Sequence, residues 1–199
     1  GGVLIFDEVI SGFRIGFGGA TAHYGIIPDL VTYGKIIGGG MPVGAYGGLL
    51  ELMKHIAPDG PVYQAGTLSG NPVAMAAGLA QLQECTKPGF YPDLERKTAT
   101  LCDRVNTHAR SKGYDCHVDH LGSIFWSFFA RGEHIKEASA IDPGSMKSYA
   151  KLHAALLERG VYAAPSGYEV GFICAAHTDA HIDRIGTAWC EALDATLRS

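Results

Sequence analysis

The chain has no long hydrophobic run, no paired-cysteine pattern and no concentration of basic residues. Its apolar runs fall far short of the roughly 20 residues that span a bilayer, so no membrane segment is predicted. The five cysteines are scattered without Cys-x-x-Cys spacing, which indicates neither a zinc site nor a disulfide framework and favours a reducing compartment. With 16 Lys and Arg against 20 Asp and Glu, the net charge of −4 gives no reason to expect nucleic-acid binding.

The sequence does have the composition of a globular α/β protein. Its 199 residues are 47% hydrophobic and 18% charged, enough for one large or two small domains. Lys87-Pro88-Gly89 ends a helix predicted over 72–85, and the character of the chain then changes. We therefore predict two domains, 1–87 and 88–199. Because the chain opens directly on a strand-like run without a leader, we expect it to be the C-terminal part of a longer protein.

A single lysine follows a strand-like segment near the middle of the first domain. The run Leu-Val-Thr-Tyr (30–33) predicts a strand, and Lys35 comes between it and the glycine triplet 38–40. In α/β folds ligands bind at the carboxyl ends of strands, where a desolvated lysine amine can form a Schiff base with a carbonyl. The alternative is a solvated lysine in a flexible loop.

An acidic residue ends the first strand-like run. The segment GVLIF (2–6) is apolar throughout, which predicts a strand buried on both faces of a parallel sheet, and Asp7 follows it directly. A segment of crossover length joins Asp7 to Lys35, so both residues are expected at the same sheet edge. A lysine and a carboxylate are the two charged groups that a pyridoxal phosphate site needs.

Three segments carry a family resemblance: DEVISGFR (7–14), PDLVTYGKIIGGGMPVGAYGG (28–48) and YQAGTLSGNPVAM (63–75). They resemble class III pyridoxal-phosphate-dependent aminotransferases, and the GTLSGNP form of the third resembles the glutamate-1-semialdehyde 2,1-aminomutase branch of that class. The resemblance covers essentially the whole chain. It implies a fold-type I PLP-dependent transferase, represented by the later part of the large domain and the small C-terminal α/β domain. The phosphate loop, the stacking aromatic and the substrate-binding arginine are expected upstream.

The resemblance also assigns roles to individual residues. It implies that Lys35 is the catalytic lysine that binds the cofactor, that Asp7 faces the pyridine nitrogen, and that Val9 packs on the cofactor ring. It implies a homodimer in which Thr67 reaches the cofactor phosphate of the neighbouring subunit. It places Glu169 at the substrate cleft. The residues alone leave other readings open. Val9 is compatible with a core valine, the spacing of the loop at Thr67 favours a helix-capping loop, and Glu169 is as readily a rim glutamate.

The implied activity is a PLP-dependent isomerisation of glutamate-1-semialdehyde to 5-aminolevulinate, in tetrapyrrole biosynthesis. The cofactor is pyridoxal 5'-phosphate, which becomes pyridoxamine phosphate during the cycle. Many class III transaminases have glutamine where this chain has Ile10, a departure that agrees with the aminomutase branch. The expected compartment is the bacterial cytoplasm, or the plastid stroma of a phototrophic eukaryote. The alternatives are a class III (omega) transaminase with another donor and acceptor pair, and an inert fragment that only dimerises.

Nine histidines raise the question of a metal site. The pairs His117/His120 and His177/His181 have spacings that could ligate zinc. No neighbouring cysteine pair or HExxH pattern accompanies them, so we predict no metal.

Overall fold

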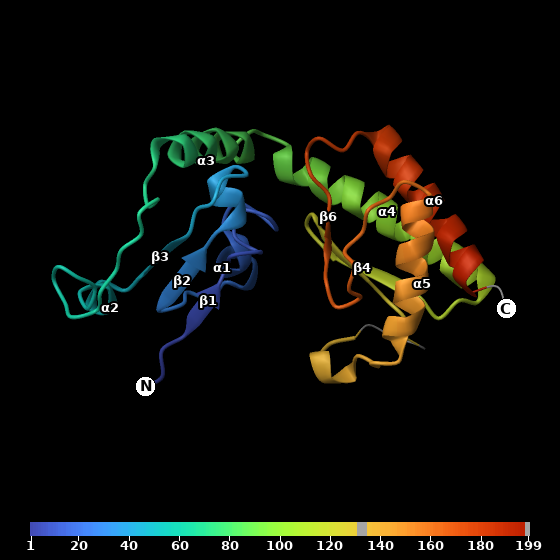
Figure 1. Ribbon diagram of the computed structural model, residues 1–199, viewed down its shortest axis with the longest axis horizontal. Coiled ribbons are helices and arrows are strands. Elements are labelled where there is room, and N and C mark those ends of the chain that lie inside the picture. The colour runs from blue at the N-terminus through green and yellow to red at the C-terminus, as the bar shows by residue number, and fades with distance from the viewer. Residues whose placement is uncertain (131–134, 198–199) are drawn as a thin grey trace. The chain divides into compact units, whose positions relative to one another are not determined.

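The computed structural model describes residues 1–130 and 135–197 (Figure 1). The chain divides into two compact units, Gly1–Tyr91 and Pro92–Ser199. None of the described helices combines the length and the apolar character needed to cross a membrane. The domain limits 1–87 and 88–199 remain a prediction.

The first unit is built on a three-stranded mixed sheet in the order β1-β2-β3. Strand β1 (Ile5–Asp7) runs parallel to β2 (Leu30–Tyr33), with Asp7 opposite Thr32, and β3 (Ala45–Gly48) pairs antiparallel to β2. Because β1 and β2 are parallel, their carboxyl ends reach the same edge of the sheet. The helices of this unit are α1 (Gly19–Tyr24), the short 3₁₀ helix η1 (Lys35–Gly38), α2 (Leu50–Met53) and α3 (Pro72–Cys85).

The prediction of a strand over 2–6 buried on both faces is wrong for this chain. The strand begins at Ile5, and Val3, Leu4 and Ile5 are 56%, 44% and 56% exposed. In the described sheet, β1 is an edge strand whose one partner is β2. An apolar run is buried on both faces only where further elements cover it.

Helix α3 confirms the helix predicted over 72–85. Its N-terminal cap is Asn71, whose side-chain oxygen accepts a hydrogen bond from the Ala74 backbone N–H at 2.9 Å. Pro72 occupies the first turn, where a missing N–H costs nothing because that donor has no intrahelical partner.

The second unit packs three long helices with an antiparallel sheet in the order β4-β5-β6. The elements are α4 (Phe90–Lys112), which begins just before the unit boundary, β4 (His117–Leu121), β5 (Ile124–Phe128), η2 (Ala138–Ala140), α5 (Ser145–Glu158), β6 (Gly171–Phe172) and α6 (Asp179–Leu197). The core side chains from these helices are almost fully buried and include Leu101, Val105, Leu152, Leu156 and Leu193. Leu101 and Val105, and likewise Leu152 and Leu156, are four positions apart, as expected on one face of an amphipathic helix.

The composition of the segment 161–163, Val-Tyr-Ala, predicts a strand, but the described secondary structure has none there. The backbone groups of this segment are bonded to α5 instead. The Val161 N–H donates to the Leu156 carbonyl at 2.9 Å and closes the helix end, and the Ala163 carbonyl lies 3.2 Å from His153 Nε2 of α5. With these groups taken by a helix, the apolar residues do not enter a sheet ladder.

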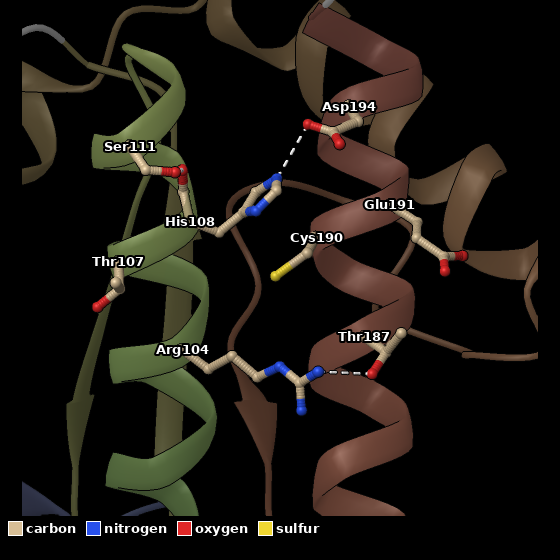
Figure 2. Close-up of a pocket in the computed structure, with 8 residues that line it drawn as sticks. All are labelled: Arg104, Thr107, His108, Ser111, Thr187, Cys190, Glu191 and Asp194. Atoms are coloured by element: carbon tan, nitrogen blue, oxygen red, sulfur yellow. Dashed lines mark hydrogen bonds and ion pairs between the residues drawn. The ribbon is translucent and has the colours of Figure 1, made fainter.

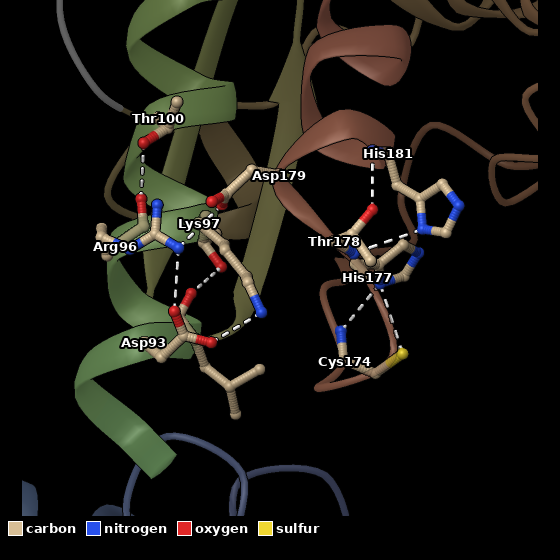
Figure 3. A network of polar contacts seen from close by, with 11 residues as sticks. Asp93, Arg96, Lys97, Thr100, Cys174, His177, Thr178, Asp179 and His181 are labelled. Carbon is tan, nitrogen blue, oxygen red and sulfur yellow. Dashed lines mark hydrogen bonds and ion pairs between the residues drawn. The ribbon is translucent and has the colours of Figure 1, made fainter. Parts of the chain in front are cut away.

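A polar network joins the start of α4 to the start of α6 (Figure 3). Arg96 donates to the carboxylates of Asp93 and Asp179, at 2.8 Å in each case, and Lys97 pairs with Asp93 at 2.6 Å. The hydrogen bonds from Lys97 and Arg96 lower the pKa of Asp93. Since most of these groups face solvent, the network contributes more to orienting the two helix ends than to stability.

Candidate active site

The carboxyl ends of β1 and β2 carry the acid and the lysine that the sequence singles out. Asp7 Oδ1 accepts a hydrogen bond from the Val9 N–H at 3.0 Å and lies 3.4 Å from the Thr32 hydroxyl, which donates to it from the neighbouring strand. The carboxylate is therefore held both to the turn that follows its own strand and to β2. Lys35 follows β2 after a single residue, Gly34, so the two charged groups share one edge of the sheet.

Lys35 adopts a backbone conformation that side chains seldom adopt. Its φ is +46°, in the left-handed region, and it opens the 3₁₀ turn η1. Such a conformation in a residue other than glycine costs on the order of 1 kcal/mol and persists where the surroundings impose it. The side chain is exposed in this chain rather than desolvated as expected, because the turn lies at the open edge of the sheet.

Val9 lies beside the backbone that leads into the lysine. A Cβ placed on Gly34 would come within 3.2 Å of Val9 Cγ1, so the valine methyl group packs directly on that glycine. Val9 is half-buried, which leaves part of its apolar surface open. The structure thus brings Asp7, Val9 and the turn of Lys35 together, although these residues come from segments far apart in the sequence.

Glu8 organises the segment between β1 and α1, and the sequence analysis gave this residue no role. Its side chain is 1% exposed and accepts hydrogen bonds from the Ser11 hydroxyl, the Ala20 and Thr21 N–H groups, and the Thr21 hydroxyl. Burial raises the pKa of Glu8, but the hydrogen bonds from Ser11, Ala20 and Thr21 outweigh it, so the pKa lies below its ordinary value. The signal was present: successive residues along a strand point to opposite faces, so of two adjacent acids one turns inward.

Thr67 lies in an exposed turn ahead of α3. The Ser69 N–H donates to the Gly66 carbonyl at 3.0 Å, and the Asn71 side-chain amide donates to the Leu68 carbonyl at 2.9 Å. This turn and η1 border one groove of about 890 Å³, whose apolar lining includes Ile37, Pro42, Val43, Leu68, Met75 and Leu79. Thr67 is therefore on the rim of a surface that begins at the lysine turn, and it is not itself part of the lining.

Asn71 connects that turn to the helix, and its replacement has a predictable cost. Asn71→Ala removes the cap on Ala74 and the bond to Leu68, so we expect α3 to lose about 1 kcal/mol of stability. Asn71→Asp keeps the capping oxygen and should lose less. Amide exchange in the first turn of α3 measures both effects, and equal exchange in wild type and Asn71→Ala would contradict the capping role.

Glu169 belongs to the second unit. It is exposed and lies in the turn ahead of β6, where its N–H donates to the Ser166 carbonyl at 3.1 Å. Its charge, after burial, contributes to raising the pKa of Tyr149. Its role at a substrate cleft stays a prediction.

The second unit contains a groove of about 400 Å³ between α4 and α6 (Figure 2). Its polar side chains are paired with one another: Arg104 donates to the Thr187 hydroxyl at 2.7 Å, and His108 lies 2.9 Å from Asp194. Burial raises the pKa of the Cys190 thiol in this groove, which makes it a weak nucleophile. We therefore interpret this groove as part of the packing between α4 and α6 and not as a catalytic site.

The histidine pairs with zinc-like spacing have other partners. His120 lies 3.1 Å from Glu95, and His177 Nδ1 accepts from the Cys174 N–H at 3.0 Å (Figure 3). Within residues 1–130 and 135–197, no group of three or more His, Cys, Asp or Glu side chains is arranged to hold a metal ion.

Comparisons with known proteins identify the family and the fold. The family model described as aminotransferase class III matches residues 1–192. An omega-transaminase from Sphaerobacter thermophilus shares 32% identity at a TM-score of 0.88, over 99% of this chain and 45% of that one. A structure described as a transaminase with PLP bound shares 28% identity at a TM-score of 0.83, over 98% and 45%. A glutamate-1-semialdehyde aminomutase from Pseudomonas aeruginosa PAO1 shares 23% identity at a TM-score of 0.81, over 98% and 45%.

The fold and the family match together define a fold-type I PLP-dependent transferase. Within that class, the chain belongs to the class III aminotransferase family. It spans less than half the length of the solved structures that it matches. These findings establish the class III family but do not single out its aminomutase branch, since the omega-transaminase matches at higher identity and TM-score than the aminomutase.

The residues present fit pyridoxal phosphate, the cofactor that the family and its solved structures support. The exposed amine of Lys35 is accessible to an aldehyde. The Asp7 carboxylate is fixed by its two hydrogen bonds and suits a protonated ring nitrogen, and Val9 offers apolar surface beside them.

Proposed function

We propose that the complete protein is a PLP-dependent enzyme of amino-group transfer with Lys35 as its catalytic lysine. The observation that carries the proposal is the meeting of Asp7, Val9 and Lys35 at the carboxyl ends of two parallel strands. When bound, pyridoxal phosphate supplies an aldehyde that takes up an amino group and a ring that accepts electron density from the substrate carbon.

Each residue of this site has a defined task. Lys35 Nζ would hold the cofactor covalently at rest and, once released, would carry a proton between the substrate carbon and the carbon of the cofactor aldehyde. The Asp7 carboxylate, fixed at the sheet edge, keeps the ring nitrogen protonated. Val9 packs against one face of the ring and keeps water from it. Glu169, from the second unit, is the proposed contact to the substrate.

For the reaction itself we propose the isomerisation of glutamate-1-semialdehyde to 5-aminolevulinate. The support is the sequence of the loop ahead of α3, Gly66 to Pro72, whose GTLSGNP form resembles the aminomutase branch, together with Ile10 in place of glutamine. In this reaction the amino group moves within one substrate. The product would feed tetrapyrrole biosynthesis.

A class III transaminase with a separate amino donor and acceptor is the second candidate. The observation that favours it is the 32% identity to an omega-transaminase, against 23% to an aminomutase. Asp7, Lys35 and Thr67 would have the same tasks in both enzymes. The two candidates differ in what must be added for turnover.

The decisive experiment uses the complete protein and glutamate-1-semialdehyde with no other amino compound. We expect 5-aminolevulinate to accumulate. Product that forms only after an external amino donor is added would replace the aminomutase by the transaminase. A reaction without protein serves as the control for spontaneous conversion of the substrate.

We also propose that the active enzyme is a homodimer in which Thr67 reaches the cofactor phosphate of the partner subunit. The support is the apolar groove that runs from the lysine turn to the turn of Thr67. Around it, Leu68, Val73 and Leu79 are 66%, 62% and 61% exposed. Large apolar side chains gathered on one surface are typical of an interface between chains.

A further inference from the structure

Helix α3 contacts the lysine turn through backbone on both sides. Gly78, in the interior of α3, faces η1 so closely that an added Cβ would overlap the carbonyl oxygen of Ile37, two residues after the lysine. Gly39, at the end of η1, faces α3 so closely that an added Cβ would overlap the carbonyl oxygen of Ala77. The two glycines therefore let a helix backbone and a turn backbone lie in direct contact.

This contact bears on the turn that carries the lysine. At the start of the turn the Ile37 N–H donates to the Gly34 carbonyl at 3.3 Å, and at its end the Gly39 N–H donates to the Ile36 carbonyl at 3.1 Å. It begins with the left-handed backbone of Lys35, which needs outside support to persist. Glycine in a helix interior costs about 1 kcal/mol relative to alanine, so Gly78 lowers the stability of α3. The close contact with η1 is a reason for a glycine at this position.

We infer that Gly78 is a positioning residue: by admitting the η1 backbone against α3, it sets where Lys35 carries its amine. The inference rests on the proposed catalytic role of Lys35 and extends it to a residue that touches neither cofactor nor substrate. A methyl group at position 78 pushes the Ile37 carbonyl, and the lysine backbone moves with it. Displacements of about 1 Å in a reacting group lower rates by roughly 100-fold.

Gly78→Ala in the complete protein tests the inference, with Gly186→Ala as its matched control. Gly186 also lies within a helix, α6, but its added Cβ would meet the flexible side chain of Arg104, with Cδ at 2.7 Å. Both substitutions raise helix propensity equally. We expect Gly78→Ala to lower kcat by about 10- to 100-fold with KM nearly unchanged, and Gly186→Ala to leave both near wild type.

A second readout needs no cofactor. Amide exchange at Ile37 and Gly39, measured on the cofactor-free protein, reports whether the turn is displaced. We expect it to be about 10-fold faster in Gly78→Ala and unchanged in Gly186→Ala. Wild-type kcat and exchange in folded Gly78→Ala would overturn the inference.

Gly39→Ala tests the same contact from the turn, with Gly40→Ala as its control. Both glycines have positive φ, +56° and +91°, but an added Cβ on Gly40 has open space around it. We expect Gly39→Ala to reproduce the loss of kcat and Gly40→Ala to retain more activity. If both Gly78→Ala and Gly39→Ala fail to fold while their controls fold, the contact serves folding and the positioning role is rejected. If Lys35→Ala retains activity, the proposed function fails instead.

Discussion

Lys35→Ala should abolish turnover in the complete protein while the fold remains intact. The substitution removes both the covalent attachment of the cofactor and the group that moves the substrate proton, and we expect a loss of about 10³-fold or more. The side chain is exposed, and the left-handed backbone that it adopts does not depend on its amine. Circular dichroism should therefore match wild type, and single-turnover kinetics measure the loss.

The control for this variant is Lys54→Ala. Lys54 follows α2 and is likewise exposed, but it lies away from the carboxyl ends of β1 and β2. It should keep wild-type turnover. Turnover of Lys35→Ala near the wild-type rate with cofactor bound would exclude Lys35 as the catalytic lysine.

Glu8→Ala should produce the largest loss of stability among the site residues. The substitution leaves the N–H groups of Ala20 and Thr21, which are half-buried residues, without their acceptor, and it also removes the acceptor of the Ser11 and Thr21 hydroxyls; we expect a cost of about 3 kcal/mol. Amide exchange at those two residues should be roughly 100-fold faster, since 1.4 kcal/mol corresponds to a factor of ten. Glu51→Ala, which removes an exposed carboxylate, should change stability by less than about 0.5 kcal/mol.

The contribution of Glu8 should also depend on pH. Its folded-state pKa is lowered below that of the unfolded chain, about 4.3. The stabilisation is therefore fully present above that value and is lost as the pH falls through the folded-state pKa. The stability difference between wild type and Glu8→Gln should be constant near neutral pH and shrink in acid. A difference that grew in acid would contradict the hydrogen-bonding role.

Local patterns in the sequence predicted the elements that depend on local chemistry. The helix predicted over 72–85 begins as α3 after Asn71 and Pro72, residue types that cap and open helices, and the run 30–33 predicted β2 with Lys35 beyond its end. The segment 161–163 was read as a strand because its composition is strand-like. Its backbone instead bonds to α5. Contacts with a neighbouring helix compete with strand pairing, and the composition of a short segment does not reveal them.

The site residues that follow a strand could be predicted from the sequence. The residues that hold the site in place could not. Asp7 and Lys35 follow apolar runs and were found from that pattern. Glu8 and Gly78 act by burial and close approach, which depend on segments 12 to 41 positions away. The exposure of Val3 to Ile5 was missed because an apolar run does not say what covers it.

The most direct test of the central claim is to locate the cofactor on the chain. The complete protein is loaded with pyridoxal phosphate, the linkage between lysine and cofactor aldehyde is reduced with borohydride, and the digested peptides are mapped by mass spectrometry. A pyridoxyl group on Lys35, absent from Lys35→Ala, is the predicted result. A label on Lys54 or another lysine, with Lys35 unmodified, would contradict the account.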